Sequence, residues 1–356
     1  MKKITFNKDR QYFSYFMIPG LYIVLQVLIK VGVISLYWKN ILMLCGINAV
    51  VACSLNMING ITGQSCLGQA GFMSIGAYVC GMVLRYFFKP YMTNAFAKYS
   101  LFAVALIIGG IAAGIIGFLI GLPSLRLKGD YLAIITLGFG EMIRVMWRVV
   151  PAAGKAIGLT SIPKVTNFTV VYVVLVIVLF VFRNLTNSKY GRSCIAVREN
   201  ELAGDTMGIN TTSAKIRAFV IAAMVAGIGG GLYASLNTYI SPDSFNSAKS
   251  TDYVLYLYAG GVGSFSSALL GSIIFTIIPE ALRFMGEWRL VFYPLALIVI
   301  MIRRPKGLFG KHEFGFMRFG IPENQYEKEE NAGIITIMNN ALKKILDKRK
   351  VSKEVK

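Results

Sequence analysis

The chain has 356 residues, of which 55% are apolar and 36 are glycine. Only 15% are charged, against about 25% in soluble domains, and the mean hydropathy is +0.61. A soluble fold cannot bury so much apolar surface, so the composition indicates a polytopic membrane protein and excludes a cytoplasmic enzyme, a DNA-binding regulator and a secreted domain. The net charge of +20 then indicates basic cytoplasmic loops, with no nucleic-acid partner.

In chain order, a basic N-terminus (residues 1–13) precedes an expected transmembrane region, residues 14–302. No small-residue cleavage site follows the first apolar segment, which we interpret as an uncleaved span. Apolar segments lie near 14–36, 41–58, 68–88, 101–122, 129–150, 168–183, 216–236, 252–263, 266–283 and 289–302. Because the last three are short or interrupted by glycine or proline, we expect an all-α integral membrane protein, a helical bundle of about eight to ten transmembrane helices with broken, glycine-rich segments.

The distribution of basic residues predicts the orientation in the membrane. More of them fall on the side of the N-terminus and the C-terminal tail, residues 303–356, which indicates that both termini are cytoplasmic. Residues 334–345 of the tail have an amphipathic helical pattern, apolar on one face and lysine-rich on the other. Such a helix can lie on membrane lipid or pack on a partner; the alternative is a solvated, partly disordered tail.

Cysteine, histidine and lysine usage excludes several kinds of chemistry. The five cysteines form no C-x-x-C pair and are expected to be reduced packing residues. His312 is the single histidine, so we expect no metal site and no catalytic triad. Gly154-Lys155 lacks the remaining residues of a phosphate-binding P-loop. We therefore expect no catalytic residues, no cofactor of its own and no ATP site in this chain.

Residues 58–78 are dense in glycine and carry polar side chains inside an apolar region. Non-helical backbone at membrane depth persists only inside protein or along a water-filled path. One interpretation places Gly63, Gln64 and Gly68 on a translocation pathway, together with Thr136 of a later helix. The alternative is close helix packing through small residues, as the Gly68 to Gly76 spacing also allows.

Residues 129–150 form a helical segment that carries Glu141 and Arg144 three residues apart. This spacing permits an ion pair within the helix, which lowers the cost of holding both charges in a bilayer. Glu141 is therefore a candidate pathway residue. The alternative is a structural pair that orients the helix near the outer interface, where Arg148 follows.

The longest internal cytoplasmic connection is expected at residues 184–215. Its middle, residues 196–207, predicts one short helix that ends at Gly208, a suitable C-terminal cap. A short acidic helix with basic flanks offers a surface to a partner, and the alternative is a solvated face.

In chain order, several runs resemble the M-type permeases of branched-chain amino-acid ABC importers. The G-Q-x-S-L-G-x-A-x-F-x-x-I-G-A-Y run is met at residues 63–78, with Cys66 in the serine position and Gln69 where histidine is common. The resemblance extends from about residue 41 to 310, and its other runs fall at residues 122–141, 198–210, 230–234, 260–271 and 303–310.

This resemblance implies a permease subunit that takes up leucine, isoleucine or valine and forms half of a translocation pathway in the bacterial cytoplasmic membrane. The implied partners are two cytoplasmic P-loop ATPase subunits that bind the ATP, a second homologous permease and an extracytoplasmic solute-binding protein. It also implies that residues 198–210 couple the permease to the ATPase. The coupling candidates are Arg198, Glu199, Glu201, Ala203, Gly208 and Asn210.

Sister permeases for other small solutes leave a second reading open. A channel or carrier for another small neutral solute, such as urea or a short amide, would work alone and leave the 196–210 segment without a partner. A membrane-embedded enzyme is a third reading, for which the sequence offers no nucleophile–base or metal set.

Overall fold

The structure, a computed structural model, describes residues 19–310 except for 21, 30, 33–34, 88–93, 126, 128, 289–293, 296–297, 299–300 and 304–306. Within these residues the chain is helical, and the β pairing is limited to one isolated antiparallel bridge between Leu159 and Ile240. The expected all-α class is confirmed. The basic N-terminus and the amphipathic tail lie outside the described residues.

The helices follow the predicted apolar segments closely. In chain order they are α2 (Leu36–Asn56), η1 (Met57–Ile61), α3 (Gln69–Phe87), α4 (Ala95–Ser124), α5 (Asp130–Val149), η2 (Pro151–Ala153), η3 (Lys155–Ile157), α6 (Phe168–Asn187), α7 (Lys189–Glu199), α8 (Glu201–Thr206), α9 (Thr211–Asn237), η4 (Pro242–Phe245), α10 (Ser247–Gly260), α11 (Phe265–Ala281) and η5 (Leu282–Trp288). Residues 22–29 are also helical.

Six helical segments among the described residues are long and apolar enough to cross a membrane. They are Leu36–Ile61, Gln69–Phe87, Ala95–Ser124, Phe168–Asn187, Thr211–Asn237 and Phe265–Gly286. In addition, α5 has 20 residues but carries charged side chains, and α10 has only 14 residues.

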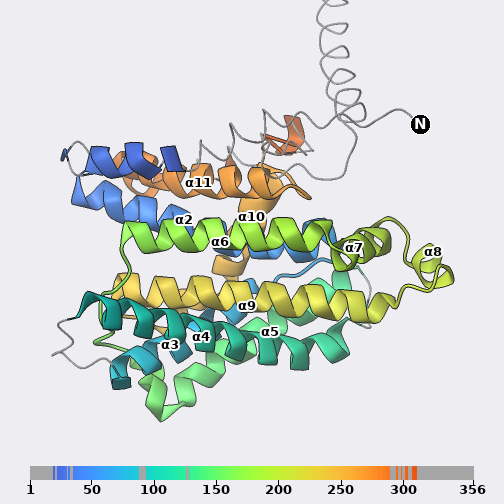
Figure 1. The fold of residues 1–356 in the computed structure, drawn as a ribbon, viewed down its shortest axis with the longest axis horizontal. Coiled ribbons are helices and arrows are strands. Elements are labelled where there is room, and N and C mark those ends of the chain that lie inside the picture. The colour runs from blue at the N-terminus through green and yellow to red at the C-terminus, as the bar shows by residue number, and fades with distance from the viewer. Residues whose placement is uncertain are drawn as a thin grey trace, which may run out of the picture.

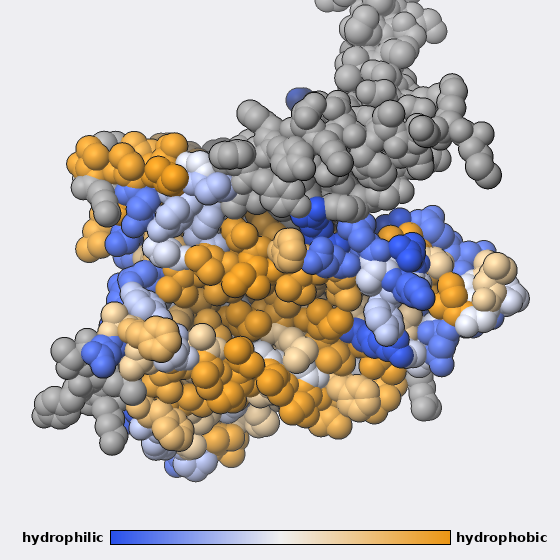
Figure 2. All heavy atoms as spheres, viewed as in Figure 1, coloured by the Kyte–Doolittle hydropathy of each residue, from blue (hydrophilic) through white to orange (hydrophobic). Residues whose placement is uncertain are grey.

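The long helices α4, α6, α9 and α11 run roughly parallel, and α7 and α8 extend beyond them at one end (Figure 1). On the visible face, apolar side chains cover the middle of the bundle, whereas hydrophilic side chains gather at the end that carries α7 and α8 (Figure 2). This distribution is typical of a bundle whose centre contacts lipid and whose end contacts water.

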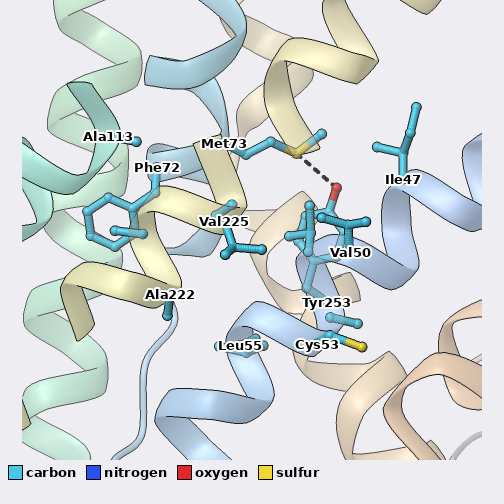
Figure 3. Packing of buried hydrophobic residues seen from close by; sticks show 14 of the residues in the cluster. Ile47, Val50, Cys53, Leu55, Phe72, Met73, Ala113, Ala222, Val225 and Tyr253 are labelled. Atoms are coloured by element: carbon cyan, nitrogen blue, oxygen red, sulfur yellow. Dashed lines mark hydrogen bonds between the residues drawn. The ribbon is translucent and has the colours of Figure 1, made fainter. Parts of the chain in front are cut away.

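Helix α9 lies at the centre of the bundle and packs against α2, α3 and α4. A Cβ atom on Gly76 would lie 2.0 Å from the carbonyl oxygen of Gly227, and one on Gly230 would lie 1.9 Å from that of Met73. Glycine at these positions therefore permits the close backbone approach of α3 and α9. Beside this contact, the hydroxyl of Tyr253 in α10 lies 3.0 Å from the sulfur of Met73 (Figure 3).

The segment between α6 and α9 differs from the prediction. The single helix expected over residues 196–207 is wrong, because α7 ends at Glu199 and α8 begins at Glu201. Asn200 between them has extended backbone, and its side chain accepts the N–H of Ala203 at 3.1 Å. This N-cap starts a new helix, so the connection consists of two short helices at a bend.

Candidate functional site

The first part of the site is residues 57–68 between α2 and α3, which we call the glycine-rich break. It begins as a π-helix, in which the N–H of Thr62 bonds to the carbonyl of Met57 five residues earlier, at 3.2 Å. Further along, the N–H of Cys66 donates to Oδ1 of Asn59 at 3.1 Å. The side-chain amide of Asn59 thus takes the place of a missing helical hydrogen bond. This allows the backbone here to depart from a regular helix.

Arg198, in the last turn of α7, joins the two motifs that the sequence singled out separately. Its Nη1 donates a 2.9 Å hydrogen bond to the carbonyl oxygen of Gly60 in the π-helix. A Cβ atom on Gly63 would lie 2.6 Å from Cγ of Arg198, and Gly63 has a φ of +72°. Nη2 of the same guanidinium lies 2.5 Å from Oε1 of Glu199. The structure therefore brings Arg198 and Gly63 into contact.

The glycine-rich turn between α10 and α11 meets the same place. The N–H of Gly263 donates to Oδ1 of Asn56 at 2.9 Å, at the end of α2. A Cβ atom on Gly60 would lie 2.7 Å from the Gly263 nitrogen, and one on Gly263 would lie 3.6 Å from Nη1 of Arg198. The glycine-rich break, the end of α7 and the turn between α10 and α11 therefore meet at Gly60. There is no room for a side chain there.

Two acidic residues of the α7–α8 connection, Glu199 and Glu201, are paired within the chain. Oε1 of Glu201 lies 2.7 Å from Nζ of Lys215 in α9, and the Lys215 side chain is only 8% exposed. Glu199 pairs with Arg198. The carboxylate of Glu201 thus also holds α8 to α9, whereas Glu199 pairs within α7.

The end of α8 and the start of α9 are fixed by two predicted residues. Gly208 has a φ of +79°, and the next residue, Ile209, donates its N–H to the carbonyl of Gly204 at 3.0 Å. This is a left-handed C-terminal cap, as the sequence predicted. Asn210 accepts the N–H of Ser213 through its side chain at 2.9 Å and so caps α9.

Two large apolar side chains are exposed in and just after α8, beside the exposed polar residues Asp205 and Thr206. Leu202 is 72% exposed and Met207 is 82% exposed, and Ala203 between them is also exposed. Exposed large apolar side chains on a short projecting helix are typical of a surface that binds another protein.

Gly68 and Thr136 also contact each other. The Oγ1 of Thr136 accepts the N–H of Leu67 at 3.0 Å and donates to the carbonyl of Ala133 at 2.9 Å. A Cβ atom on Gly68 would lie 2.5 Å from the Thr136 carbonyl oxygen. Both residues are buried where α5 packs against the start of α3, and Gln64 is also buried, with 9% of its surface exposed. Their role in a pathway stays a prediction.

Glu141 belongs to a charged network on α5. Its Oε2 lies 2.7 Å from Nε of Arg144, so the predicted ion pair is confirmed. Nη1 of Arg144 also lies 3.3 Å from Oδ1 of Asp243 in η4, and Arg148 pairs with the same carboxylate. Asp243 could not be predicted as a partner from the sequence, because it lies 99 residues beyond Arg144.

Comparison with known proteins identifies the family. Residues 37–302 match the protein family described as the branched-chain amino acid transport system permease component. The chain belongs to this permease family. It is 30% identical over 294 residues to the high-affinity branched-chain amino acid transport system permease protein LivM of Salmonella typhimurium, covering 73% of this chain and 67% of that relative.

Two further relatives agree with this membership. The LivM protein of Escherichia coli is 31% identical over the same shares of the two chains. A probable branched-chain amino acid transport permease protein LivM of Methanocaldococcus jannaschii is 27% identical over 67% of this chain and 79% of its own length. No solved structure matches the chain. Membership and the six long apolar helices together make this chain a multi-pass membrane transport protein.

In this permease, polar atoms around the glycine-rich break lack partners among the residues that the structure describes. They are Nδ2 of Asn56, Oε1 of Gln64 and Oε1 of Gln69. The three side chains are buried, and burying an unpaired amide atom costs about 1–3 kcal/mol. Sequence reasoning missed Asn56, although a polar residue inside a long apolar segment is itself a signal of a functional position.

Proposed function

We propose that this chain is the membrane-spanning permease subunit of an ATP-binding-cassette importer for leucine, isoleucine and valine. With a second homologous permease it forms the translocation pathway across the bacterial cytoplasmic membrane, and both termini face the cytoplasm. Support for the solute comes from the relatives, which are named as branched-chain amino acid transport system permeases.

The observation that carries the proposal is the hydrogen bond between Arg198 and the carbonyl of Gly60. It connects a projecting pair of helices, α7 and α8, to a break in the helices of the bundle. In the proposed importer, two cytoplasmic P-loop ATPase subunits bind ATP, and one of them docks on α8. Movement of α8 and α7 is then transmitted through Arg198 to the glycine-rich break.

The docking surface follows from the exposure of the α8 residues. Leu202 and Met207 are the apolar anchors that enter a groove on the ATPase. Glu199 and Glu201 lie at the rim of this surface, where the pair of Glu201 with Lys215 also holds α8 against α9.

The pathway assignment is supported by the unpaired amide atoms beside the glycine-rich break. Asn56, Gln64 and Gln69 offer one donor and two acceptors with no net charge. Weak, neutral contacts suit a transporter, because the solute must also leave. The extracytoplasmic solute-binding protein supplies tight binding and delivers the amino acid at the opposite end of the bundle.

Gentle purification of the full chain from its native membrane, at native expression, tests this proposal. We expect two P-loop ATPase subunits and a second permease to be recovered in fixed stoichiometry, and the complex to take up leucine when ATP is supplied. Recovery of a lone chain or homo-oligomer that conducts urea or a short amide without ATP would contradict the proposal and favour a channel or carrier.

A further inference from the structure

A cavity lies between α7 and α9, beside the coupling candidates Gly208 and Asn210. Its volume is about 280 Å³, and its walls come from the last turn of α6, the first turns of α7, the turn at residues 208–210 and the first turns of α9. Leu185, Ala218 and Ile221 form an apolar wall, and Met57 of the π-helix also lines the cavity.

The rim of the cavity is basic and rich in hydroxyl groups. Lys189 and Arg217 line it and are exposed, and the guanidinium of Arg217 lies over the ring of Tyr190, 5.1 Å from its centroid. Ser193 and Ser213 add hydroxyl groups. None of the lining residues is acidic. A ligand that pairs with these cations and hydroxyl groups must carry negative charge and accept hydrogen bonds.

The position of the cavity indicates which kind of ligand fits it. It lies where α6 and α9 meet α7, at the end of the bundle where the apolar face gives way to hydrophilic side chains (Figure 2). A ligand there has access to water at the basic rim and to the hydrocarbon region along Leu185 and Ile221. An anionic headgroup joined to an acyl chain fits both halves, because basic pockets between helices at this depth bind anionic lipid headgroups.

We propose that the cavity between α7 and α9 binds one anionic phospholipid, with its phosphate between Lys189 and Arg217 and an acyl chain against Leu185 and Ile221. The bound lipid then stabilises the packing of α7 on α9. Because Met57 lines the same cavity, the lipid also contacts the π-helix that Arg198 bonds.

Native mass spectrometry of the purified full-length chain, titrated with phosphatidylglycerol and with phosphatidylcholine, tests this site. We expect phosphatidylglycerol to bind more tightly. Arg217→Gln and Lys189→Gln are each expected to weaken it about fivefold, as for one basic residue at an anionic surface, without changing phosphatidylcholine binding. Arg192→Gln is the matched control, since Arg192 is an exposed arginine of α7 outside the cavity, and it should bind phosphatidylglycerol like the unmodified chain.

A second pair of measurements separates a lipid from a free anion. Ile221→Asn keeps both cations and places an amide on the apolar wall, so it should weaken long-chain phosphatidylglycerol but not glycerol phosphate. Excess inorganic phosphate should displace little of the long-chain lipid. Equal binding of the two lipids, an equal loss in Arg192→Gln, or full displacement by inorganic phosphate with no effect of Ile221→Asn would each overturn the proposal.

Discussion

Arg198 and Gly60 are 138 residues apart in the chain and are joined by a 2.9 Å hydrogen bond from Nη1 to the carbonyl oxygen. Gly60 belongs to a π-helix, a rare form that is frequent at functional positions. A charged donor at the end of α7 thus holds a carbonyl whose own helix is already interrupted. This contact directly connects the end of α7 to the glycine-rich break.

Substituting Gly63 with alanine should disrupt the contact between the glycine-rich break and Arg198 of α7. At a φ of +72° a Cβ atom costs about 1–2 kcal/mol, and here it also lies 2.6 Å from Cγ of Arg198. We expect Gly63→Ala to lower the thermal unfolding temperature of the purified chain in detergent. Gly138→Ala is the matched control, because nothing lies within 4 Å of a Cβ atom there. Equal stability of the two variants would contradict the described contact.

At position 208, the backbone conformation alone should decide which side chains can replace glycine. Its φ is +79°, yet nothing lies within 4 Å of a Cβ atom at this position. Asparagine tolerates the left-handed conformation and β-branched valine does not. We therefore expect Gly208→Asn to keep most ATP-dependent leucine uptake in membrane vesicles and Gly208→Val to lose it, with both variants present in similar amounts by immunoblot. Normal uptake by Gly208→Val would exclude a role of this cap in coupling.

Removing the carboxylate of Glu201 should destabilise the packing of α8 on α9. Glu201→Gln leaves the ammonium group of Lys215, 8% exposed, without its ion-pair partner. Because Glu201 itself is 30% exposed, water weakens the pair, and we expect a loss of about 1–2 kcal/mol, less than for a fully buried pair. The double variant Glu201→Gln with Lys215→Met should recover part of the lost unfolding temperature. No loss in Glu201→Gln would show that the pair contributes nothing.

The thiol of Cys194 should react slowly near neutral pH. Burial raises its pKa, and a hydrogen bond with Thr62 and the charge of Arg217 lower the pKa by less. The thiolate is the reactive form, so a raised pKa reduces its population at neutral pH, and the rate of alkylation should increase as the pH rises. Peptide mapping by mass spectrometry after maleimide labelling measures this rate. A cysteine introduced at exposed Thr212 serves as the fast control, and equal rates at neutral pH would contradict the burial of Cys194.

The sequence was sufficient to predict most of the helices and the positive φ of Gly208. Long apolar runs and one glycine at the end of a short helix are local signals, and they appear in the structure as α4, α9 and the cap of α8. The ion pair between Glu141 and Arg144 was equally local, because three residues on a helix bring two side chains together.

Contacts between residues far apart in the chain could not be predicted from the sequence. The helix predicted over residues 196–207 was wrong because Asn200 is also a strong N-cap, and its bond to the N–H of Ala203 competes with continued helix. Nothing in the sequence placed Arg198 beside Gly60, or Asp243 beside Arg144, since these contacts depend on how distant helices pack.

The most direct test of the account is the coupling of ATP hydrolysis to transport when Arg198 is changed. In proteoliposomes that contain the complete importer, Arg198→Ala removes a charged donor worth about 1.5–3 kcal/mol from the Gly60 carbonyl. We expect leucine uptake per ATP hydrolysed to fall at least about tenfold, with hydrolysis largely retained. Arg192→Ala, on the same helix, should behave like the unmodified importer. Unchanged uptake per ATP in Arg198→Ala would contradict transmission through Arg198 and Gly60.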